Sequence, residues 1–256
     1  MNGMLDAMTE LLLLCLAGGA AGLLNAVAGG GTFLSLPALI YVGVPPVAAN
    51  ATATLSALPG YLSSAWAFRG DMSAEGALGL RAILGLAALG SILGALLLIV
   101  TPGETFPWIV PWLLLLATLL FATGPLLLKA LRQRGGGAAG PVVSGAAILA
   151  VSVYGGYFNG GLGIMLLAAF SLLGHTDLHG MNGLKNLLSA VLSLISAAAF
   201  VWAGLIAWEQ ALILAVSATA GGYAGARLSR RIVRTDLLRW FITLVGAAMT
   251  IAFFLA

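Results

Sequence analysis

The chain has 256 residues, of which 61% are hydrophobic and 7% charged, with a formal net charge of +3. A soluble domain carries about 25% charged residues, so this composition excludes a soluble globular protein and predicts one all-α integral membrane domain, residues 1–256. The single cysteine, Cys15, excludes an internal disulfide and a cysteine metal cluster. Asp6 and Glu10 precede the first apolar run without any Lys or Arg. This is unlike the basic start of a signal peptide, and we expect the run to be retained.

Apolar segments follow one another along the chain and predict about 8–10 membrane segments. Their bounds are 11–28, 32–43, 47–68, 77–100, 108–130, 141–157, 160–173, 179–203, 209–226 and 237–256. A full helical span needs about 20 residues, and the segments 32–43 and 160–173 are shorter. Each is preceded or opened by a glycine-rich break, so we expect each to be the second arm of a helical hairpin that crosses the membrane only partly.

The two halves of the chain share a pattern of glycines at one constant spacing. The matching pairs are Gly29 and Gly160, Gly43 and Gly174, Gly90 and Gly221, and Gly94 and Gly225. Glycine is common in this chain (35 residues), so a single match means little, but several at one spacing predict an internal repeat. We expect a first repeat over 1–131, a cytoplasmic linker over 132–140 and a second repeat over 141–256. Small residues four apart also allow close helix packing in lipid.

Basic residues predict the orientation, because Lys and Arg in short loops favour the cytoplasm. They gather in three loops, Arg69 to Arg81, Lys129 to Arg134 and Arg227 to Arg239. If each hairpin enters and leaves on the same side, all three loops fall in the cytoplasm and the two repeats are inverted. We expect a multi-pass protein of a bacterial plasma (inner) membrane, with both termini extracytoplasmic. Paired helix breaks in inverted repeats are typical of transporters and mark the substrate site.

Lys185 is the only basic residue well inside a predicted span, away from its ends, and every Asp and Glu maps to a loop or a segment end. A buried lysine without a carboxylate suits an anionic substrate, because charges are costly at the bilayer centre. The alternative is that the side chain snorkels to the interface. Asn182 and Asn186 flank Lys185 at helical spacing, so the three residues lie near one helix face.

In the first half, Asn50, Thr52 and Thr54 occupy the matching region. Facing the second-half set across a pseudo-twofold axis, they are expected to line one polar cavity. The alternative is that such side chains only join helices by hydrogen bonds.

Backbone groups at the breaks complete the candidate substrate site. The residues concerned are Asn25, Gly30, Gly31 and Thr32 at the first break, and Asn159, Gly160 and Gly161 at the second. A helix that starts after glycines directs its N–H groups at the break and favours anions there, and Thr32 is expected to cap that helix or to contact the ligand. The alternative is that the glycines serve only close packing.

Other polar and aromatic residues carry weaker signals. His175 and His179 stand at the start of the helix of Lys185, where they either shuttle protons or simply lie at the interface. Six tryptophans near span ends are typical of an interfacial belt. They are Trp66, Trp108, Trp112, Trp202, Trp208 and Trp240. The sequence contains no metal-ligand cluster, nucleophile triad or phosphate loop, so we expect no metal, no cofactor and no enzymatic activity.

Two glycine signatures resemble those of the sulfite exporter TauE/SafE family, also called the toluene-sulfonate uptake permease family. The first runs from Gly22 through Asn25-Ala26-Val27-Ala28-Gly29-Gly30-Gly31 to Pro37-Ala38-Leu39, and continues as Gly43-Val44-Pro45-Pro46-Val47-Ala48-Ala49-Asn50-Ala51-Thr52. The second is Tyr154-Gly155-Gly156-Tyr157-Phe158-Asn159-Gly160-Gly161-Leu162-Gly163. The resemblance implies a small membrane carrier for sulfur-containing anions such as sulfite, sulfonates or sulfoacetate.

The leading hypothesis is therefore a secondary-type, alternating-access transporter for such anions. An anion-selective channel and a carrier for another small carboxylate anion remain alternatives. The expected partners are a small anionic substrate and the lipid bilayer, without nucleic acid, while a coupling ion (H⁺ or Na⁺) and a homodimer are left open.

Overall fold

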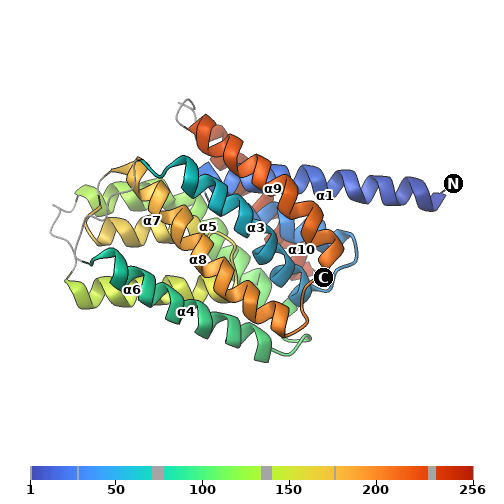
Figure 1. Cartoon of the computed structure of the whole chain (residues 1–256), viewed down its shortest axis with the longest axis horizontal. Helices are drawn as coiled ribbons and strands as arrows, with labels where there is room; N and C mark the ends of the chain where they lie inside the picture. The colour runs from blue at the N-terminus through green and yellow to red at the C-terminus, as the bar shows by residue number, and fades with distance from the viewer. Residues whose placement is uncertain are drawn as a thin grey trace.

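The computed structural model describes residues 2–27, 29–70, 78–133, 140–175, 177–229 and 235–255. Over these ranges the chain forms ten α-helices and no strand (Figure 1). The helices are α1 (Asn2–Val27), α2 (Thr32–Tyr41), α3 (Pro46–Ala67), α4 (Leu80–Val100), α5 (Phe106–Gln133), α6 (Pro141–Tyr157), α7 (Leu162–Leu172), α8 (Leu178–Trp202), α9 (Trp208–Ser229) and α10 (Thr235–Leu255). The all-helical prediction is confirmed, with α1 beginning well before residue 11.

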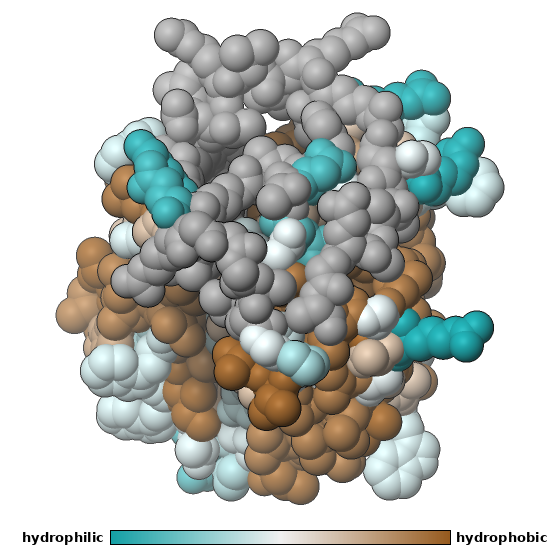
Figure 2. Space-filling model, turned by 90° about the vertical axis from the view of Figure 1, so that its left-hand side faces the viewer, coloured by the Kyte–Doolittle hydropathy of each residue, from teal (hydrophilic) through white to brown (hydrophobic). Residues whose placement is uncertain are grey.

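Several helices suit a bilayer by length and composition. In the described part of the chain, four contain an apolar stretch long enough to cross a membrane: α1, α4, α8 and α9. The surface agrees, since all six tryptophans are exposed. Figure 2 looks onto the left-hand side of Figure 1, where hydrophilic residues stand out from a largely hydrophobic surface. The protein is thus a membrane-embedded helical bundle.

Two of the helices are too short to cross a bilayer. Helices α2 and α7 have 10 and 11 residues, about 15 Å at 1.5 Å per residue, against a hydrocarbon core of about 30 Å. Both end in the same way: Gly43 and Gly174 have positive φ angles of 86° and 92°. The next residue in each case donates its N–H five residues back, from Val44 to Leu39 O and from His175 to Phe170 O, both at 3.0 Å. This is the Schellman motif, for which glycine is the favoured residue.

Glycines also set the closest helix contacts. Helix α9 packs against α1 and α3, helix α4 packs against α6 and α8, and α3 and α8 contact each other. A Cβ atom added to Gly94 of α4 would overlap the backbone of α6 at Val153, and one added to Gly221 of α9 would overlap the backbone of α1 at Gly19. These glycines therefore join helices within one chain, as expected for small residues in lipid.

Candidate functional site

The two glycine breaks touch each other inside the bundle. Gly29, between α1 and α2, has a φ of +83° and donates its N–H to Leu24 O at 2.8 Å. A Cβ atom at Gly29 would overlap the Cα of Gly163, in the first turn of α7. Both the left-handed backbone and this contact require glycine at position 29. Segments more than 130 positions apart in the sequence thus meet at one point.

Lys185 of α8 closes the first break. Its side chain has no exposed surface, and its Nζ donates to Asn25 O and Ala26 O at 3.2 Å and to Asn182 Oδ1 at 3.1 Å. These bonds use all three protons of an ammonium group. The two carbonyls belong to the last turn of α1, where helix carbonyls lack partners within the helix and a cation is favoured. Lys185 therefore does not snorkel; it caps the broken end of α1.

Neutral groups close the second break. The side-chain amide of Asn50, from α3, donates to Tyr157 O in the last turn of α6 at 2.9 Å. The hydroxyl of Tyr154 donates to Gly160 O at 2.7 Å. Asn159 accepts from the hydroxyl of Tyr61 and donates to Ser193 Oγ, both at 3.3 Å. The carbonyl end of α6 is thus held by an amide where that of α1 is held by an ammonium.

The side chain of Asn25 binds one of the backbone N–H groups at the N-terminus of α2. Its Oδ1 accepts the N–H of Gly31, the N-cap residue of α2, at 2.7 Å. Thr32 is buried at the first position of α2, but the side-chain acceptor at this helix N-terminus is Asn25 of α1, and the N-cap residue is Gly31. Capping by the Thr32 hydroxyl is therefore not observed. Gly161, the N-cap of α7, has a φ of +72° and lies against Ala117.

The two threonines of α3 have structural hydrogen bonds. Thr52 Oγ1 accepts the backbone N–H of Ala207, in the connection between α8 and α9, at 3.0 Å. Thr54 Oγ1 donates to Asn50 O, one turn back in its own helix, at 2.9 Å. Both are buried. Helix-joining hydrogen bonds, the alternative considered from the sequence, account for Thr52.

Asn186 stands out among the buried polar side chains. It has no exposed surface, and within the described part of the chain neither its Oδ1 nor its Nδ2 has a hydrogen-bond partner. The same holds for Asn50 Oδ1 and Ser189 Oγ. A buried polar group without a partner costs about 1–3 kcal/mol, so such atoms point to a bound water, ion or ligand.

The expected polar cavity is closed in this structure. A small cavity of about 10 Å³ is bordered by Asn25, Ser35 and Ser56, but not by Lys185, Asn50 or Asn186. A water needs roughly 10–15 Å³ by this measure, so the cavity holds one water at most. The candidate residues are brought to the centre of the bundle, yet they do not line one open space.

Some residues of the centre were missed in the sequence. They are Tyr61, Tyr154, Ser189 and Ser193. The two serines could have been found from helical spacing, because Ser189 and Ser193 continue the row of polar residues begun by Asn182 and Asn186 on α8. Of the two histidines, His175 is buried beside the ring of Phe170, with 5.5 Å between centroids. The side chain of His179 lies outside the described residues.

Comparisons with known proteins show which proteins this chain resembles in sequence. The family model described as "Sulfite exporter TauE/SafE" matches residues 14–253. A "Probable membrane transporter protein" of Haemophilus influenzae is 31% identical over 248 residues, which cover 94% of this chain and 92% of that protein. "Probable membrane transporter protein YfcA" of Escherichia coli K12 is 29% identical over 236 residues, covering 90% and 84%. A Sinorhizobium protein, "Probable membrane transporter protein ORF9", is 27% identical, covering 85% and 82%. No solved structure matches the chain.

Proposed function

The chain belongs to the sulfite exporter TauE/SafE family of membrane transporters, and from this premise we propose that it carries small sulfur-containing anions by alternating access. The substrates we propose are of the sulfonate, sulfoacetate or sulfite class. The observation that carries the proposal is the polar centre, where Lys185 and Asn186 are both fully buried and the amide of Asn186 has no hydrogen-bond partner among the described residues.

The chemistry of these groups suits an oxyanion. A sulfite or sulfonate head presents three oxygens that only accept hydrogen bonds from N–H and O–H donors. Asn186 Nδ2 and Ser189 Oγ offer donors that no described residue uses, and Lys185 supplies the positive charge. An arriving anion has only to replace Asn182 Oδ1 as the third acceptor of Lys185 Nζ, while the α1 carbonyls keep the other two protons.

The closed centre favours a carrier over a channel. Lys185, Asn186 and Asn50 all have no solvent-accessible surface, so a substrate enters only after helices move. Such gating around a central site is the essence of alternating access. The alternatives remain an anion-selective channel seen in a closed state and a carrier for another small carboxylate anion.

The helix contacts support a twofold repeat around this centre, and we propose that the two repeats are inverted. The contact of α9 with α1 has a counterpart in that of α4 with α6, and the contact of α9 with α3 has one in that of α4 with α8. Each contact turns into its counterpart when every helix of α1–α5 is replaced by the helix five places later, and every helix of α6–α10 by the helix five places earlier. Figure 1 draws both chain ends on its right-hand side. We propose that these ends are extracytoplasmic and that the membrane is a bacterial inner membrane.

Proteoliposome transport tests the proposal. Purified protein is reconstituted, and uptake of sulfite, sulfoacetate and taurine is measured with and without the same anion inside. We expect saturable uptake of one anion, accelerated by internal substrate, and at least tenfold slower uptake in Asn186→Leu, which removes the unpartnered donor. Ser217→Ala is the matched control, because that hydroxyl only bonds Ile213 O of its own helix. Non-saturable flux without counter-flow would favour the channel, and normal flux in Asn186→Leu would remove Asn186 from the site.

A further inference from the structure

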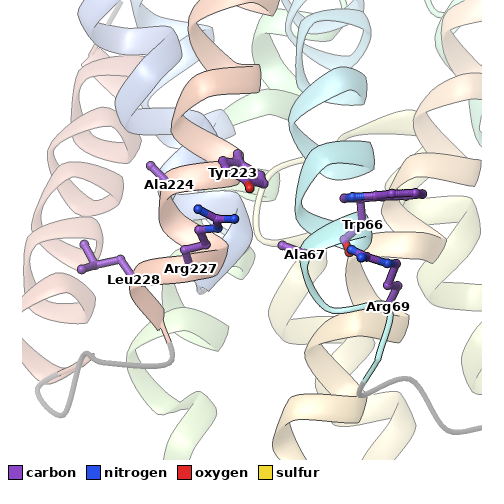
Figure 3. Close-up of a pocket in the computed structure, with 7 residues that line it drawn as sticks. All are labelled: Trp66, Ala67, Arg69, Tyr223, Ala224, Arg227 and Leu228. Atoms are coloured by element: carbon purple, nitrogen blue, oxygen red, sulfur yellow. The ribbon is translucent and has the colours of Figure 1, made fainter.

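A second group of positive charges lies outside the polar centre, where α3 and α9 end side by side. An open pocket of about 800 Å³ is formed there by Trp66, Ala67 and Arg69 on one side and by Tyr223, Ala224, Arg227 and Leu228 on the other. Figure 3 shows the two arginines at the ends of the neighbouring helices, each beside an aromatic ring of its own segment. The pocket therefore combines two permanent positive charges with aromatic side chains.

The aromatic rings hold the two guanidinium groups in place. The Cζ of Arg69 lies 4.3 Å from the ring centroid of Trp66, and that of Arg227 lies 4.5 Å from the ring of Tyr223. Arg69 also donates one N–H to Trp66 O at 2.8 Å. A guanidinium has five N–H donors and matches a phosphate with two parallel bonds. Stacking on a ring fixes the position of each guanidinium and leaves its edge available for such bonds.

An apolar groove continues from this pocket along the same two helices. It has a volume of about 500 Å³ and is bordered by Ser63, Val216, Thr219, Ala220 and Tyr223. Tyr223 borders both spaces. The α9 members recur every three or four residues, so they share one face. The floor is fixed by Ser63, whose hydroxyl donates to Thr219 O at 3.2 Å. Val216 is 73% exposed, as expected of a side chain that faces lipid.

We propose that this pair of spaces binds one anionic phospholipid, with its phosphate at Arg69 and Arg227 and an acyl chain along Val216 and Ala220. The charges lie at the helix ends, and the apolar groove runs inward from them. A membrane lipid has the same arrangement, with its head group at the surface and its chains directed inward. Basic pockets between membrane helices are suited to anionic head groups. Trp66 and Tyr223 occupy the level at which such rings favour the interface.

Lipid competition on the purified protein tests this site. The protein is incubated in mild detergent with equal amounts of phosphatidylglycerol and phosphatidylcholine bearing the same chains, and bound lipid is counted by native mass spectrometry. We expect the wild type to prefer phosphatidylglycerol by on the order of tenfold, because arginines near the membrane surface attract head groups with a net negative charge. R69A/R227A should lose this preference. R69K/R227K should keep most of it, which separates charge from folding. Arg81→Ala, an exposed arginine that does not border the pocket, is the matched control.

Two further experiments distinguish binding of a lipid from binding of a soluble anion. Ala220→Phe narrows the apolar groove without changing the charges, and we expect it to release phosphatidylglycerol. Glycerol phosphate, the head group without chains, should compete poorly. Equal binding of both lipids by the wild type, or an unchanged preference in R69A/R227A, would overturn the proposal. So would efficient displacement by glycerol phosphate with no effect of Ala220→Phe, since the pocket would then bind a soluble anion.

Discussion

The two helix breaks meet at one point but are closed by different chemistry. At the first break, the carbonyl end of α1 receives two hydrogen bonds from the ammonium of Lys185. At the second, the carbonyl end of α6 receives one from the amide of Asn50. Hydrogen bonds to a charged group contribute about 1.5–3 kcal/mol, against about 1 kcal/mol for neutral ones. The two breaks thus differ in the charge of the side chain that caps each carbonyl end.

On the proposed function, this difference would give the two halves separate tasks in transport. An anion that reached the centre would be attracted to the first break, because the only described charge there is Lys185. Its binding would change the partners of that ammonium and so act on the end of α1. We propose that the second break, held by neutral groups, is the fixed surface against which the first one moves. Each prediction below perturbs one break and uses the other, or a matched residue, for comparison.

The largest effect is expected from Lys185→Met, which keeps an unbranched side chain, shorter by one atom, and removes its charge. The carbonyls of Asn25 and Ala26 then lose their partner inside the membrane. We expect a loss of about 2–3 kcal/mol in stability and of at least 100-fold in anion flux. Thermal unfolding in detergent and proteoliposome uptake measure the two effects. Lys129→Met, at an exposed lysine of α5, should change neither. A stable Lys185→Met protein with full flux would contradict both roles of the lysine.

Gly29→Ala is expected to have the next largest effect, because two unfavourable contributions to the folding free energy combine at that position. The left-handed φ of +83° costs a residue with a Cβ about 1–2 kcal/mol, and the new methyl group overlaps Gly163. Gly43→Ala isolates the first cost: its φ is +86°, but nothing lies within 4 Å of an added Cβ. We expect Gly29→Ala to lower the melting temperature more and to slow transport, while Gly43→Ala affects stability alone. Equal effects would mean that the contact between the breaks contributes nothing.

The bounds of the helices could be predicted from the sequence, whereas most hydrogen-bond partners of their polar residues could not. Segment lengths, glycines and prolines are local signals, so the predicted bounds of α2, α6 and α8 lie within a few residues of those observed. Two of the three partners of Lys185, the carbonyls of Asn25 and Ala26, lie on α1, 160 and 159 positions away in the sequence. Both roles considered for its ammonium placed it against substrate or water, and neither considered a backbone carbonyl. Whether Thr52 faces a ligand or Ala207 likewise depends on packing between distant helices.

A smaller effect is expected at the second break from Asn50→Ala. This change removes one neutral hydrogen bond, to Tyr157 O, and also an Oδ1 that has no partner among the described residues. The two consequences oppose each other, so we expect a loss of about 1 kcal/mol or less. Flux should fall by less than tenfold. Asn50→Asp is the informative companion, because it places a negative charge at the centre and should abolish anion uptake. If Asn50→Ala stopped transport as fully as Lys185→Met, the second break would be part of the anion site and the division of tasks would be wrong.

The smallest effect is expected from Tyr154→Phe, which removes only the hydroxyl that donates to Gly160 O at 2.7 Å. The ring remains in contact with Phe158, at 6.1 Å between centroids, so packing is kept. Hydrogen bonds between membrane helices average about 0.6 kcal/mol, and we expect a fall of that order in unfolding free energy with little change in flux. Tyr61→Phe removes the corresponding bond to Asn159, and the double variant should show additive losses if both bonds only support a fixed surface. A loss of flux in the double variant without a further loss of stability would instead mean that the second break moves during transport, because static support alone would lower stability first.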